Sequence, residues 1–97
     1  MAKYVTLYRF TDEGIRNVKG SPARVRAGIQ KAEALGIKVL GTYYTQGEYD
    51  LVIIADVPDD KAGMALALAQ AAQGTSRSTT MRAYDLAEFD EIVKMMP

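Results

Sequence analysis

The chain has 97 residues, 48% of them hydrophobic, and its 12 Lys and Arg balance its 12 Asp and Glu, so we expect one domain over residues 1–97 and neither nucleic acid nor a membrane as a partner. It contains no Cys, which excludes thiolate catalysis and disulfides and favours a cytoplasmic location. It also contains no His, which excludes a Ser-His-Asp triad within the chain and removes the commonest zinc ligand, so we predict no metal site and no cofactor.

The first predicted element is a strand over Lys3–Phe10, which is rich in β-branched and aromatic residues. No long apolar stretch precedes or follows it, so we expect neither a signal peptide nor a spanning helix. Thr11 is suited to cap a short helix. Ser21 is the predicted N-cap of a longer helix, and Gly36 is placed to end that helix in the left-handed conformation.

Two further strands, Ile37–Thr45 and Tyr49–Val57, predict a β-hairpin around Gly47. We expect a three-residue loop that ends at Gly47, with this glycine in the left-handed position. This register places Val39 and Tyr43 on the helix-facing side of the sheet, together with alternate residues of the second strand. A two-residue loop would instead place Val39 and Tyr43 beside acidic residues, where their apolar surface would not be buried.

The remaining elements complete a mixed pattern. Asp59 is the expected N-cap of a helix over Asp60–Gln73, and a polar strand over Ser76–Tyr84 and a helix over Asp85–Met95 follow. The order strand, helix, strand, strand, helix, strand predicts an α+β fold of ferredoxin-like βαββαβ topology. We expect a four-stranded antiparallel sheet with both main helices on one face.

The face of this sheet that points away from the helices is also predicted to be apolar. It carries Tyr4, Tyr8, Phe10, Leu40, Tyr44, Val52, Ile54 and Tyr84. Five half-exposed aromatic rings alone reach the largest patch that monomers usually show, about 300–600 Å². We therefore predict a homodimer that buries this face. The alternative cover is the terminal helix folding back, and the apolar circumference of the Asp60–Gln73 helix leaves a further subunit contact open.

Four segments resemble a known family in the same order along the chain. They are Leu7–Ile15, Ser21–Arg24, Tyr43–Asp50 and Pro58–Asp60. The third contains Gly47, Tyr49 and Asp50, and is similar to the Gly-x-Tyr-Asp hairpin that names the GYD-domain family. The resemblance implies a dimeric α/β barrel, the architecture of small monooxygenases, muconolactone-type isomerases and amino-acid-sensing domains, but it implies no function. Asp56 departs from the family, which often has Glu there, and this weakens any role for that carboxylate.

Polar side chains are interspersed on the predicted open face, as in small-molecule sites. The ligand-binding candidates are Tyr8, Thr42, Tyr44, Asp50, Arg82 and Tyr84, with Thr6 and Thr80 on the same face. Asp50 is the most informative, because a carboxylate on a covered face needs a partner such as Arg82 or a tyrosine hydroxyl. The structural alternative is that Asp50 accepts bonds from backbone amides at the rim of the sheet. For the tyrosines, the structural alternative is burial in the core or an interface.

Three functions are compatible with these residues. The first is a module that binds a small, largely apolar molecule at the sheet or dimer face. The second is a cofactor-free isomerase or monooxygenase-like enzyme that uses Asp50, Arg82 and tyrosines, and the third is a purely structural assembly domain. The lack of His tilts against the enzyme, and a pocket of about 300 Å³ or more would favour ligand binding over the structural role.

Overall fold

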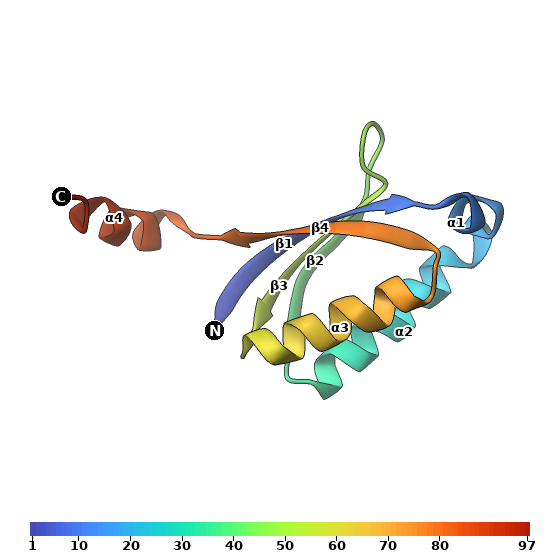
Figure 1. Cartoon of the computed structure of the whole chain (residues 1–97), viewed down its shortest axis with the longest axis horizontal. Coiled ribbons are helices and arrows are strands. Elements are labelled where there is room, and N and C mark those ends of the chain that lie inside the picture. The colour runs from blue at the N-terminus through green and yellow to red at the C-terminus, as the bar shows by residue number, and fades with distance from the viewer.

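Four antiparallel strands form one sheet in the order β2-β3-β1-β4, with two long helices across one of its faces (Figure 1). This computed structural model describes all of residues 1–97. Its elements are β1 (Ala2–Phe10), α1 (Asp12–Arg16), the 3-10 turn η1 (Val18–Gly20), α2 (Ser21–Ala34), β2 (Lys38–Tyr44), β3 (Leu51–Val57), α3 (Asp60–Ala72), β4 (Ser76–Ala83) and α4 (Leu86–Lys94). The predicted α+β fold with ferredoxin-like topology is confirmed.

Helix ends follow the capping residues in most places. The Thr11 side chain accepts a hydrogen bond from the Gly14 N–H at 3.1 Å, and the Asp59 carboxylate accepts one from the amide three residues later at 2.9 Å. Both satisfy backbone donors that a helix start leaves without partners. Gly36 follows α2 with φ of 78°, the left-handed conformation that glycine adopts without strain. These three predictions are confirmed.

The start of α2 differs from the prediction. Ser21 is the first helical residue, and Gly20 stands at the N-cap without a side-chain bond. The turn η1 delivers the chain to Ser21 already in helical backbone geometry, so Ser21 lacks the extended conformation that a side-chain cap requires. Its hydroxyl instead forms a hydrogen bond of 2.8 Å with the Tyr44 hydroxyl.

The helices α2 and α3 cover the sheet without packing closely against it along its length. Only 7 of the 97 residues are buried, so side chains leave much of the space between helices and sheet unfilled. The tightest packing joins Ala32, Ile37 and Val57, where α2 leads into β2 and β3 ends. The partly buried residues around them are Tyr4, Val39, Ala55, Ala62 and Leu66.

Strand β1 presents its aromatic side chains to the helices, not away from them. Tyr4 pairs with Ala55 and Tyr8 with Leu51, both on the helix-facing side of β3. The prediction that Tyr4, Tyr8 and Phe10 lie on the open face is therefore wrong. Alternation identifies which residues of β1 share a face, but both of its faces contain apolar residues, so only the pairing with β3 decides which one the helices cover.

The hairpin has a longer loop and a different register from those predicted. Tyr44 pairs with Leu51 and Tyr43 with Val52, which leaves residues 45–50 as the loop. An irregularity between Val39 and Gly41 inserts a residue into β2, so the alternation reverses beyond it. Val39 faces the helices as predicted, but Tyr43 points away from them and is 60% exposed, and Tyr44 lies on the helix-facing side.

Gly47 has φ of 110°, so its predicted left-handed conformation is confirmed within the longer loop.

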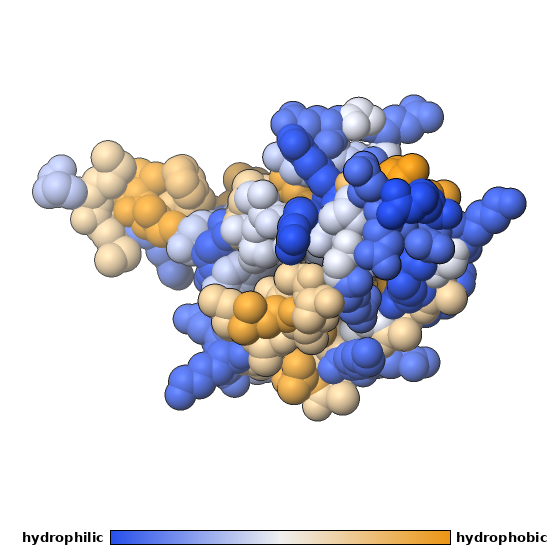
Figure 2. Space-filling view, turned by 45° about the vertical axis from the view of Figure 1, so that its right-hand side comes forward, coloured by the Kyte–Doolittle hydropathy of each residue, from blue (hydrophilic) through white to orange (hydrophobic).

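The outer face of the sheet is apolar, as predicted, and Val52 and Ile54 lie on it as predicted, but its other residues differ. Register places Val5, Leu7, Val52, Ile54 and Met81 together there. Neither α2 nor α3 lies on this side, and α4 does not fold back over it. Instead α4 projects beyond the end of the sheet, and its apolar atoms form a separate lobe (Figures 1 and 2).

Candidate functional site

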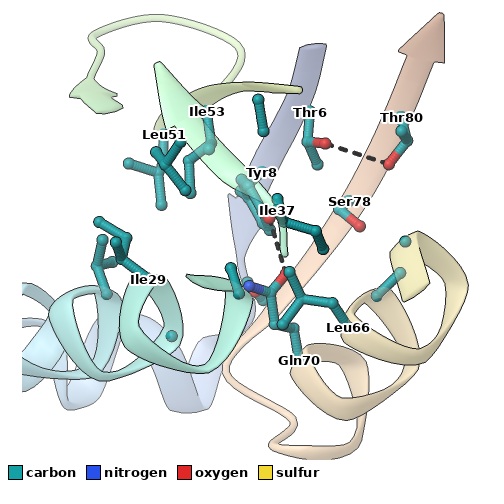
Figure 3. A pocket seen from close by; sticks show the side chains of 18 of the residues that line it. Thr6, Tyr8, Ile29, Ile37, Leu51, Ile53, Leu66, Gln70, Ser78 and Thr80 are labelled. Atoms are coloured by element: carbon teal, nitrogen blue, oxygen red, sulfur yellow. Dashed lines mark hydrogen bonds between the residues drawn. The ribbon is translucent and has the colours of Figure 1, made fainter. Parts of the chain in front are cut away.

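A cavity of about 380 Å³ lies between the sheet and the two long helices (Figure 3). Small residues of the helices make this space: Gly28 and Ala32 of α2, and Gly63 and Ala67 of α3, all line it. Their side chains are too short to reach across to the sheet, so the layers enclose a volume of the size that small-molecule sites have. The larger side chains around it are Tyr4, Thr6, Tyr8, Phe10, Arg24, Val25, Ile29, Ile37, Val39, Leu51, Ile53, Val57, Asp60, Met64, Leu66, Gln70, Gln73, Ser78 and Thr80.

Tyr8 is the principal polar group of the cavity. It lies near the C-terminal end of β1 and is only 7% exposed, and its hydroxyl donates a hydrogen bond of 2.8 Å to Gln70 Oε1 on α3 (Figure 3). A second neutral pair, Thr6 and Thr80, lies further along the sheet with its hydroxyl oxygens 3.3 Å apart. The wall is therefore mostly apolar with a few hydroxyl and amide groups, and two charged side chains, Arg24 and Asp60, also line it. Arg24 donates to the Asn17 carbonyl and Asp60 accepts from the Tyr4 hydroxyl.

Burial raises the pKa of the Tyr8 hydroxyl above its ordinary value of about 10, and the hydrogen bond to Gln70 offsets only part of this effect. A pKa that is higher in the folded than in the unfolded chain gives stability that is fully present below about pH 10 and is lost as the pH rises through the folded value.

We therefore expect Tyr8→Phe to make the decline in the free energy of unfolding above about pH 10 shallower. Urea unfolding at intervals between pH 8 and 11 measures this. Tyr43→Phe is the matched control, because the Tyr43 ring is exposed on the outer face, and its profile should follow the wild type. Identical profiles for wild type and Tyr8→Phe would show that Tyr8 carries no such coupling.

A cluster of charged and aromatic side chains lies where β1 begins and β4 ends. The Tyr4 hydroxyl donates to Asp60 Oδ1 at 2.9 Å, and this bond to a carboxylate is the main cause of a raised pKa of Tyr4. The Arg82 guanidinium stacks 4.3 Å from the Tyr84 ring centre and lies 3.7 Å from a Glu88 carboxylate oxygen. It also donates to backbone carbonyls, so its donors hold the end of β4 in place.

Asp50 makes contacts with the backbone and not with Arg82. Its Oδ2 accepts a hydrogen bond of 2.8 Å from the Phe10 N–H, and its own N–H donates to the Tyr8 carbonyl at 2.8 Å. These bonds tie the loop to the end of β1, which is the structural role considered above. Arg82 pairs with Tyr4 near the other end of β1, so Asp50 and Arg82 do not share one site.

Of the six candidates, only Tyr8 lines the cavity. Tyr44 reaches its margin through Ser21, which does line it. Thr42 lies in β2 opposite Ile53 without lining the cavity, and Arg82 and Tyr84 belong to the cluster at the end of β4.

Gln70 and Ser78 also line the cavity, although the sequence did not predict either residue as part of a site. Gln70 carried one signal, because it is the lone polar residue within the apolar run from Ala62 to Ala72.

Comparison with known proteins gives a family and a relative. The model of the family described as "GYD domain" matches residues 4–93. The chain is also similar to "Glutamine synthetase and cystathionine beta-lyase binding protein" of Thermus thermophilus, with 26% identity over 89 residues that cover 91% of this chain and 94% of the relative. No solved structure matches. No helix is long and apolar enough to cross a membrane, and no three acidic side chains cluster as metal ligands would.

Proposed function

The chain belongs to the GYD domain family, and from this premise we propose that it is a homodimeric binding module that holds a small, largely apolar molecule between its sheet and its helices. The observation that carries the proposal is the cavity of about 380 Å³, whose wall is mostly apolar with a small number of polar groups. This combination of volume and lining is typical of small-molecule sites. The sequence predicts the ligand on the outer face of the sheet. Thr6, Tyr8 and Thr80, which it assigns to that face, instead line the cavity on the helix-facing side.

The polar groups define the chemistry of the ligand. The Tyr8 hydroxyl already donates its hydrogen to Gln70 Oε1. The Gln70 amide N–H groups and the lone pairs of the Tyr8 oxygen are available to a guest. A ligand with an apolar body and one hydroxyl or carbonyl group matches them. A charged ligand matches them less well, because the two charged side chains of the lining already have partners in Asn17 and Tyr4 and burial of an unpaired charge is costly.

The same geometry favours binding over catalysis. The polar groups that line the apolar part of the cavity include the buried Tyr8, whose pKa is raised, the Gln70 amide and the hydroxyls of Thr6 and Thr80. At neutral pH this tyrosine keeps its proton, so it serves as a hydrogen-bond donor and not as a general base. The carboxylate proposed for the enzymatic alternative, Asp50, is already bonded to the Phe10 amide.

The outer face of the sheet supports the homodimer. Val5, Leu7, Val52, Ile54 and Met81 lie together in register there, and no element of the same chain covers them. A second copy offers the same apolar surface, and two-fold symmetric contacts between identical surfaces are the commonest in soluble oligomers. Sheets stacked face to face in this way would form the dimeric α/β barrel that the resemblance implies, with one cavity in each protomer.

Ala67→Phe tests the cavity, because Ala67 lines it from α3 and a benzyl group there would occupy much of its volume. We expect this variant to bind 2-naphthol, an apolar probe with one hydroxyl, at least about tenfold more weakly than the wild type, which is a loss of about 1.4 kcal/mol. Equilibrium dialysis measures the affinity. Ala27→Phe is the control, since Ala27 is exposed on α2 and does not line the cavity. Equal binding by all three proteins would refute the cavity as the site.

A second function, binding of a partner enzyme, is supported by the name of the Thermus thermophilus relative. Sedimentation velocity tests this function. The protein is mixed with purified glutamine synthetase or cystathionine beta-lyase from the organism that encodes it. A faster-sedimenting species that contains both proteins would support the function. Unchanged boundaries at micromolar concentrations of each would count against it.

A further inference from the structure

The C-terminal helix α4 is well formed but makes few contacts with the rest of the chain. Asp85 and Glu88 form a reciprocal capping box, with bonds of 2.8 and 3.1 Å, and Arg82 holds Glu88 from β4. These contacts fix where the helix begins. Beyond them α4 projects away from the sheet (Figure 1), and a helix of nine residues is too short to be stable in water by itself.

One side of α4 is apolar and exposed. The large residues on it are Leu86, Phe89 and Val93, and Met96 follows two residues beyond the end of the helix. We call these four residues the α4 stripe, and they range from 48% to 86% exposed. Their spacing of three or four residues places them on a single face. Figure 2 shows the segment that contains α4 as a projecting, largely apolar lobe. Four large side chains on so small an element indicate a surface that another surface covers.

A second exposed apolar surface runs along α3. Its solvent side carries Met64, Ala65, Leu68, Ala69 and Ala72, which we call the α3 ridge, while Leu66 and Gln70 face the sheet. Met64 and Leu68 are 62% and 63% exposed. In Figure 2 this ridge forms the apolar patch at the lower centre of the body.

We propose that the α4 stripe of one copy packs on the α3 ridge of a second copy. The two surfaces are complementary in size, because the stripe consists of large side chains and the ridge alternates large residues with alanines, which allow helices to approach closely. The elements that flank the two surfaces are complementary in charge. Within α4, three acidic residues stand against one Lys, whereas α2, which packs beside α3, has three basic residues and one Glu.

This contact is separate from the sheet-face dimer and from the ligand. The stripe and the ridge lie outside the cavity lining except for Met64, and neither belongs to the outer face of the sheet. α4 cannot cover the α3 ridge of its own chain without leaving the position in which the capping box and Arg82 hold it. A contact with the α3 ridge of another copy leaves both the capping box and the Arg82 contact intact.

Cysteine crosslinking tests the proposal, because the chain has no Cys and each introduced thiol is unique. Leu68→Cys and Phe89→Cys are prepared as full-length chains of different tagged mass, mixed and oxidised. We expect a disulfide-linked product of mixed mass, at several times the yield of the control mixture of Leu68→Cys with Ala87→Cys, whose thiol lies on the opposite side of α4. The double variant Leu68→Cys/Phe89→Cys reports on contact within one chain.

A mixed product no more abundant than the control overturns the proposal, and so does a double variant that links only within its own chain. Sedimentation equilibrium adds a second readout. Phe89→Asp should weaken this association at least about tenfold, whereas Ala87→Asp should not. If Phe89→Asp leaves self-association unchanged while the sheet-face dimer persists, α4 serves another partner, and the proposed dimer and ligand site stand without it.

Discussion

Ile54→Lys is expected to dissociate the proposed homodimer, raising its dissociation constant at least about a hundredfold. Ile54 lies near the centre of the outer face and pairs directly with Val5. A lysine there would bring its ammonium group into an apolar contact, opposite the same residue of the partner near the two-fold axis, and an unpaired buried charge is costly. The monomer should stay folded, because the side chain points away from the helices. Sedimentation equilibrium measures the constant.

Gln30→Lys is the matched control for this prediction. Gln30 is exposed on α2, on the other side of the molecule, and the same change should leave the association constant unaltered. Circular dichroism of both variants checks that they remain folded. A stable Ile54→Lys dimer would show that the copies associate through some other surface.

Gly14→Ala is expected to lower the free energy of unfolding by about 2–4 kcal/mol. Gly14 is buried in α1, where an added Cβ would overlap the Thr75 carbonyl oxygen and lie 3.3 Å from Phe10 Cβ. That carbonyl is backbone, so α1 itself must move. Movement breaks the bond from the Thr11 N–H to the Thr75 carbonyl at 3.1 Å and the bond from the Thr11 hydroxyl to the Gly74 carbonyl at 2.7 Å. Urea unfolding measures the loss.

Gly28→Ala supplies a control with the opposite sign. Gly28 lies inside α2, and an added Cβ would have Gln70 Nε2 as its nearest neighbour at 3.7 Å, an ordinary contact. Helix propensity alone therefore predicts a gain of about 0.5–1 kcal/mol. Propensity would favour alanine at both positions, so a stabilised Gly14→Ala would mean that the close approach of α1 to Thr75 is relieved without cost.

The order of elements and most helix ends follow from the sequence because they depend on local chemistry. Thr11 and Asp59 cap helices by bonding amides three residues away, and Gly36 ends α2 through its own backbone. Each of these signals acts within a few residues. The ferredoxin-like order then follows from connection rules that hold for any chain with this pattern.

The faces of the sheet could not be predicted in the same way. Straight alternation along β2 assigns Tyr43 to the helices, but the inserted residue between Val39 and Gly41 reverses the pattern and turns Tyr44 inward instead. Likewise, the assignment of Tyr8 depends on its pairing with Leu51, a contact more than forty residues away along the chain. Register is a tertiary property, and an error of one residue inverts every side chain.

The candidate site could be predicted only in part from the sequence, because it also depends on tertiary packing. Tyr8 was singled out as an aromatic residue with a hydroxyl, and it does line the cavity. The cavity itself results from how far small residues such as Gly28 and Ala67 hold the helices from the sheet, which no single segment reveals. The sequence identifies Asp50 as a carboxylate in a motif. Its hydrogen bond with the Phe10 amide cannot be predicted from that motif, because it forms only when the folded hairpin loop lies against the end of β1.

A chain of this length keeps little thermodynamic reserve when side chains leave the middle of its interior unfilled. A guest that occupies the cavity therefore replaces packing that the polypeptide does not supply. At a ligand concentration a hundred times its Kd, mass action adds about 2.7 kcal/mol to the folded state. Melting temperature and resistance to proteolysis would then rise together with the supply of that compound, and the lifetime of the protein would depend on the proposed ligand.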